Sequence, residues 1–128
     1  MRTPPPSTDR TLTVSSGTTD GIGCLTLRGA AVPDTLDPLL SAIDTLFAAG
    51  VRGIVVDAAG VTCWSRRGLE IAVLTSTRAQ GRRIAFAVCG LPDDQLDVLR
   101  RRWPGVRSHQ FAYVNRSTGL AAIAATTS

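Results

Sequence analysis

Hydrophobic residues recur three or four positions apart in the segment that follows Pro33. They are Leu36, Leu39, Leu40, Ile43, Leu46 and Phe47. This spacing places them on one face of a helix, with polar residues on the opposite face. The pattern therefore predicts an amphipathic helix that begins near Leu36 and ends near Gly50.

Strand patterns flank this helix on both sides. Gly53–Asp57 and Ile84–Val88 are almost entirely apolar, which is typical of strands buried on both faces and predicts that they lie centrally in a sheet. Near the N-terminus, Thr11–Ser15 alternates between polar and apolar residues, and Ile22–Leu27 is a second strand candidate. The turn-rich stretch Gly17–Gly21 between them predicts a hairpin.

Two further helices follow the predicted central strands. Ser65 can cap a second helix that continues to about Gln80, and Gly81 would stop it. A third helix opens at Asp93 and ends at Pro104, with acidic residues in its first turns and arginines in its last. That arrangement of charge complements the helix dipole. Its inner stripe consists of Leu96, Leu99 and Trp103.

The C-terminal part predicts a short strand at Phe111–Val114 and a last helix at Thr118–Ala125, capped by Ser117 or Asn115. The complete order is ββαβαβαβα. Alternating helices and strands imply crossover connections, so we expect an α/β fold whose sheet is largely parallel after the first hairpin. The prediction is a mixed sheet of four to five strands with about four helices. This order would allow all helices to lie on one face, leaving the other for the hairpin or a partner.

Chain length and composition fit one domain. The chain has 128 residues, of which 44% are hydrophobic, enough to bury a core. Residues 1–10 include three consecutive prolines and no apolar run, so we expect a flexible segment rather than a signal peptide. The domain is assigned to residues 11–125. No apolar run is long enough to cross a membrane, and a cytoplasmic location is expected.

The positive charge has a compositional explanation. The formal net charge is +4, which by itself suggests nucleic acid as a partner. However, all 14 basic residues are arginines, which is typical of a GC-rich genome. The cluster Arg100–Arg102 is also explained by the end of a helix. Nucleic-acid binding is therefore the least favoured function.

The residues that usually perform catalysis or bind metals do not form a recognisable set. Cys24, Cys63 and Cys89 are widely separated and read as buried free thiols, and the one histidine, His109, has no evident nucleophile partner. The chain also lacks the glycine-rich loop and lysine that hold nucleotide phosphates. The sequence predicts a protein that is not an enzyme, with no catalytic residues, no cofactor and no metal.

The segment Ile54–Leu69 resembles the core of a STAS domain, the fold of bacterial anti-sigma factor antagonists. Its hydrophobic strand ends in Asp57, as in the family, and Gly29 matches a family glycine before the first helix. The resemblance covers about Leu12 to Ile123. It implies a non-enzymatic regulator of transcription that works by partner switching. The implied partner is an anti-sigma factor with a kinase-like ATP-binding fold, or another regulatory protein.

The phosphorylation loop of this family aligns without gaps but with different residues. The family's Asp falls on Ser65, its phosphorylated Ser on Arg66, and its second Ser or Thr on Arg67, whereas Gly68 and Leu69 match. The resemblance therefore implies a scaffold that has lost phosphorylation at the usual position. Ser65 could be a displaced phosphoacceptor, although its role as a helix cap is preferred.

A partner-binding patch is predicted at this helix entrance. Its residues are Trp64, Ser65, Arg66, Arg67, Gly68 and Leu69. Trp64 has two interpretations, as a contact residue at the surface or as a side chain folded onto the core. An alternative function is a small-anion or nucleotide sensor, in which the helix start and the two arginines hold the anion. The identity of the partner and the oligomeric state stay open.

Overall fold

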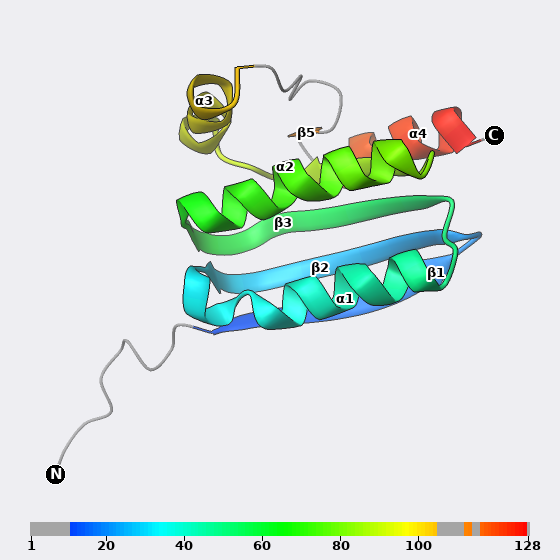
Figure 1. Cartoon of the computed structure of the whole chain (residues 1–128), viewed down its shortest axis with the longest axis horizontal. Helices are drawn as coiled ribbons and strands as arrows, with labels where there is room; N and C mark the ends of the chain where they lie inside the picture. The colour runs from blue at the N-terminus through cyan, green and yellow to red at the C-terminus, as the bar shows by residue number, and fades with distance from the viewer. Residues whose placement is uncertain (1–10, 105–111, 114–115, 128) are drawn as a thin grey trace, which may run out of the picture.

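The structure is a computed structural model that describes residues 11–104, 112–113 and 116–127 (Figure 1). In chain order, its elements are β1 (Leu12–Thr19), β2 (Ile22–Ala31), a short 3₁₀ helix (Pro33–Thr35), α1 (Asp37–Ala48), β3 (Gly53–Trp64), α2 (Arg66–Gly81), β4 (Ala85–Cys89), α3 (Asp93–Arg102), β5 (Ala112–Tyr113) and α4 (Arg116–Thr127). No helix in these described ranges is long and apolar enough to span a membrane.

The sheet is mixed and five-stranded, with the strand order β1-β2-β3-β4-β5. β1 pairs with β2 in antiparallel orientation, and all later pairs are parallel. The predicted α/β fold and the order of its elements are confirmed. β3 and β4 are interior strands, as their continuous apolar runs indicate.

The first hairpin is tighter than its sequence prediction. β1 continues to Thr19, which pairs with Ile22, so the turn consists of Asp20 and Gly21 alone. Both residues have positive φ, 55° and 79°, the left-handed conformation that a two-residue hairpin requires. The prediction of a wider turn over Gly17–Gly21 was wrong, because Gly17 stays in register opposite Cys24.

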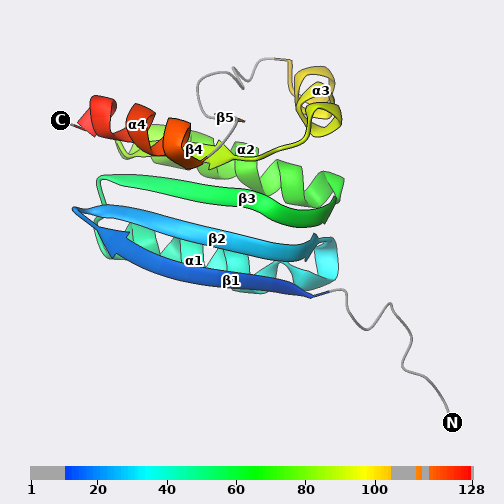
Figure 2. The same ribbon diagram turned by 180° about the vertical axis from the view of Figure 1, so that it is seen from behind.

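Helices cover both faces of the sheet, so the arrangement with all helices on one face is wrong. α1 and α2 lie on one face (Figure 1), and α4 lies on the other, where it packs against β3 and β4 and faces the viewer in Figure 2. Alternate strand residues explain this division. On β3, Ile54 and Val56 join the core beneath α1 and α2, whereas Val55 packs with Ile123 of α4.

Residues 58–64 continue β3 almost to the start of α2, although the sequence suggested a loop at these positions. β3 runs on to Trp64, and β2 continues beyond its predicted end at Leu27 to pair Ala31 with Trp64. β4 follows only the first half of β3, because its pairing ends where Cys89 meets Asp57. The second half of β3 therefore projects beyond β4 and carries the start of α2.

The later helices agree with their predictions in place but differ at their ends. α3 has the predicted stripe, with Leu99 buried and with Leu96 and Trp103 packed against the core. α4 already begins at Arg116, so Ser117 lies within the helix and is not its cap. The alternative cap, Asn115, lies outside the described residues, as do Phe111 and Val114 of the predicted strand and residues 1–10.

The C-terminal end of α2 also differs from its prediction. Gly81 is the last residue of the helix rather than the residue that ends it, and the left-handed position is taken by Arg83, with φ of 57°.

Candidate functional site

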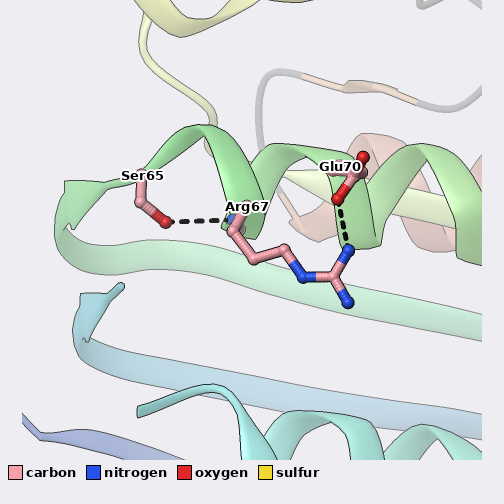
Figure 3. A network of polar contacts seen from close by, with 4 residues as sticks. Ser65, Arg67 and Glu70 are labelled. Atoms are coloured by element: carbon pink, nitrogen blue, oxygen red, sulfur yellow. Dashed lines mark hydrogen bonds and ion pairs between the residues drawn. The ribbon is translucent and has the colours of Figure 1, made fainter. Parts of the chain in front are cut away.

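Ser65 joins the start of α2 to the end of β2. Its Oγ accepts a hydrogen bond from the backbone N–H of Gly68 at 3.1 Å, which is the predicted helix cap (Figure 3). Its Oγ and its backbone N–H both donate to the carbonyl oxygen of Ala31, each at 2.9 Å. A cap of this kind stabilises a protein by about 1 kcal/mol. The sequence predicted the cap but not the contact between Ser65 and Ala31, because Ala31 is brought close to Ser65 by the pairing of β2 with β3.

The hydroxyl of Ser65 is thus used twice within the protein. Phosphorylation of this oxygen would remove the proton donated to Ala31 and would crowd the amide of Gly68. The geometry favours the capping role. The role as a displaced phosphoacceptor stays a prediction, and it would require both of these contacts to break.

Gly68 and Leu69 point inward rather than toward a partner. A Cβ on Gly68 would lie 2.9 Å from the carbonyl oxygen of Ala31 and 3.1 Å from Cε3 of Trp64. Leu69 is 1% exposed and belongs to the core. These two positions therefore lie beneath the helix entrance, and neither contributes a side chain to an outer patch, although the sequence prediction included both.

Trp64 folds back onto the core. It is half-buried and packs against the main hydrophobic cluster. Its Nε1 is buried, and no described residue provides it with a hydrogen-bond partner. Of the two interpretations left open by the sequence, the structure supports the one in which Trp64 is mainly a packing residue.

Arg66 and Arg67 are the exposed members of the predicted patch. Arg67 extends along α2 and forms an ion pair with Glu70, one helical turn later (Figure 3). The side chain of Arg66 forms no hydrogen bond or ion pair with any of the described residues. We call the surface made by Ser65, Arg66, Arg67 and Glu70 the helix-entrance surface. Glu70 was missed in the sequence, although its spacing from Arg67 is a recognised signal for a pair on a helix.

This geometry weakens the anion-sensing alternative. Arg67 is engaged with Glu70, and Ser65 Oγ already occupies the amide of Gly68. Of the two arginines, Arg66 alone would be free to bind an anion at the start of α2, so the pair does not form a preorganised clamp.

The cysteines differ from their prediction at one position. Cys89 is buried and Cys24 is half-buried, but Cys63 is exposed, so its assignment as a buried thiol was wrong. The reason is that Cys63 lies on the part of β3 that projects beyond β4. In the described ranges all three cysteines are free, and no group of His, Cys, Asp or Glu is arranged as a metal site. His109 lies outside the described residues.

Solved structures of other proteins share this fold. An anti-sigma factor antagonist from Mycobacterium paratuberculosis matches with a TM-score of 0.69 at 21% identity, over 88% of this chain and 94% of that chain. The anti-sigma factor antagonist SpoIIAA, in its unphosphorylated form, matches with a TM-score of 0.63 at 10% identity, over 85% and 94%. A sulfate transporter family protein from Wolinella succinogenes matches with a TM-score of 0.69 at 12% identity, over 86% and 90%.

These similarities show that the chain has the STAS-domain fold, as its sequence pattern indicated. No family model and no curated protein matches the sequence itself.

Proposed function

We propose that this chain is a protein-interaction module that regulates transcription in the cytoplasm by binding another protein, as a STAS-like anti-sigma factor antagonist or a related partner-switching regulator. The helix-entrance surface supports this proposal most directly. Arg66 and Arg67 stand exposed at the start of α2, where the family resemblance places the regulated residues. The similarity to two antagonists of known structure supports it further.

The proposed partner is an anti-sigma factor with a kinase-like ATP-binding fold. Arg66 has no hydroxyl, and the hydroxyl of Ser65 is held by Ala31 and Gly68. In relatives with a phosphorylated serine, the phosphate adds nearly two negative charges to this surface and can expel the partner. Here the surface stays cationic, so we propose binding that phosphorylation does not control and an action that depends on binding rather than catalysis.

A phosphorylation assay tests this proposal. Incubation of the wild-type protein with a purified anti-sigma factor of this kind and labelled ATP should leave Arg66 and Ser65 unlabelled. The double variant Ser65→Asp, Arg66→Ser restores a family-like loop, and it should accept about one phosphate per molecule. Aspartate can accept the hydrogen bond from Gly68 as the helix cap, but it cannot donate to Ala31. We therefore expect this variant to fold with a free energy of unfolding lower by about 1 kcal/mol, which a thermal melt checks.

The single variant Ser65→Asp is the matched control, since it changes the cap without adding a hydroxyl at position 66. It should stay unlabelled. Stoichiometric labelling of the wild-type protein at Ser65 would show that the acceptor has moved by one residue and that phosphorylation still controls this protein.

A further inference from the structure

Two polar side chains at the inner face of α2 lack a hydrogen-bond partner among the described residues. One is Trp64, whose Nε1 is buried and unpaired. The other is Thr75, which is 5% exposed and whose Oγ1 forms no hydrogen bond with any described residue. Buried polar groups in folded proteins are nearly always paired with protein or with water. The two groups therefore indicate a hydrogen-bonding molecule beneath α2.

Thr75 differs from the other threonines of α1 and α2. Thr45 and Thr77 each donate to the carbonyl oxygen four residues earlier, at 2.9 and 3.2 Å, as threonines within helices commonly do. Thr35 is also buried, and its hydroxyl donates to the carbonyl oxygen of Ala30 at 2.6 Å. The hydroxyl of Thr75 has no such partner among the described residues, so its hydrogen-bonding capacity is unused.

The N–H of Trp64 lies on the far edge of its ring from the start of α2. The ring atom nearest to the Cβ position of Gly68 is Cε3, at 3.1 Å, and Cε3 and Nε1 are on opposite edges of an indole. The ring packs against the main hydrophobic cluster. A donor held in such surroundings without an acceptor lowers stability, so an acceptor of the right size is favoured there.

Trp64 and Thr75 line the same cavity. It has a volume of about 20 Å³ and lies between α1, α2 and the sheet. The other described residues that line it have apolar side chains or none, with Leu39, Ile43 and Val56 among them. One water molecule requires about 10–15 Å³ of such space. The cavity therefore has room for one water molecule and is too small for a larger ligand.

The chemistry of the two groups selects the same occupant. An indole N–H only donates, whereas a hydroxyl both donates and accepts. A water molecule can accept from Trp64 Nε1 and donate to Thr75 Oγ1, which gives it the two protein partners that an internal water needs. An apolar occupant would leave both groups unpaired. An ion would lose its hydration without gaining a charged partner, because no charged residue lines the cavity in the described part of the chain.

We infer that this cavity is a binding site for one internal water molecule, which accepts a hydrogen bond from Trp64 Nε1 and donates one to Thr75 Oγ1. The water connects the residue before the helix cap with the third turn of α2. It holds the Trp64 ring inward, beneath the helix-entrance surface. The site is independent of the proposed partner, because all of its contacts lie within the chain.

A high-resolution crystal structure of the full chain tests the site directly. It should show density for one water within about 2.7–3.2 Å of both Trp64 Nε1 and Thr75 Oγ1. Thr75→Val keeps the shape of the side chain but removes the hydroxyl. This variant should lose the water and leave the Trp64 N–H unpaired, so urea denaturation should show a folding equilibrium constant lower by about tenfold.

A double-mutant cycle tests whether the water joins the two residues. Trp64→Phe removes the other polar group, and the double variant with Thr75→Val should lose at least about fivefold less than the product of the two single losses. Thr77→Val is the matched control, since its hydroxyl bonds to Val73 and it does not line the cavity. Its loss should combine with that of Trp64→Phe without coupling.

Three results would overturn the inference. One is a crystal structure without water density between Trp64 and Thr75. The second is a direct hydrogen bond between Trp64 Nε1 and Thr75 Oγ1. The third is a cycle in which Thr75→Val couples to Trp64→Phe no more than Thr77→Val does. The crystallographic result concerns the wild-type protein, so it stands even where a variant does not fold.

Discussion

Replacing Gly68 with alanine should lower the free energy of unfolding by about 2 kcal/mol, although alanine is the better helix former. The added methyl group would lie 2.9 Å from the Ala31 carbonyl oxygen and 3.1 Å from Trp64 Cε3. The same carbonyl oxygen accepts both hydrogen bonds from Ser65. Relief of the clash therefore moves the anchor that holds α2 on β2, which outweighs the gain of nearly 1 kcal/mol in helix propensity. Urea denaturation measures the difference.

Gly81→Ala is the matched control in the same helix. A Cβ at this position meets no atom within 4 Å, so the substitution should be neutral or should stabilise the protein by up to about 1 kcal/mol. Equal effects at the two glycines would show that the close approach of α2 to β2 does not limit the residue at position 68.

Removing the two exposed arginines should weaken partner binding about thirtyfold or more, which corresponds to about 2 kcal/mol. The change is Arg66→Ala with Arg67→Ala, and the measurement is calorimetric titration with the anti-sigma factor. Arginines at the centre of an interface are among the residues whose truncation costs most. The stability of the free protein should change by less than about 1 kcal/mol, because the exposed Arg67–Glu70 pair contributes little.

The double variant Arg100→Ala, Arg101→Ala provides the control for charge. It removes the same number of positive charges from exposed positions of α3, at the end of that helix. It should bind nearly as well as the wild-type protein, with a small loss from reduced long-range attraction. Equal losses for the two double variants would mean that overall charge drives the binding and that the helix entrance is not the contact site.

The periodic segments were predictable from the sequence, because each element could be judged on its own residues. The helix from Leu36 toward Gly50 and the central strand at Gly53–Asp57 depend on local spacing that burial enforces. The second half of β3 was not predictable in this way. Its residues are held by pairing with β2, up to Ala31 opposite Trp64, and a pairing between distant segments leaves little local pattern. The position of α4 on the second face follows from the same kind of distant packing.

At the candidate site, the types of residue could be predicted from the sequence, but the directions of their side chains could not. Ser65 was predictable as a cap because its role concerns the next few residues. Whether Trp64 and Leu69 face solvent depends on the neighbouring strand and the core, and the structure turns both inward. The exposure of Leu40 was not predictable for the opposite reason, since this residue fits the apolar stripe of α1 by spacing but lies at its exposed margin.

The most direct test of phosphorylation-independent binding is one calorimetric titration, performed with and without prior incubation of the two proteins in magnesium and ATP. The wild-type protein should bind the anti-sigma factor with the same affinity in both conditions. The Ser65→Asp, Arg66→Ser variant should lose at least tenfold in affinity after incubation, because a phosphate then stands at the start of α2. A wild-type affinity that falls after incubation with ATP, or an absence of binding in both conditions, would contradict the account.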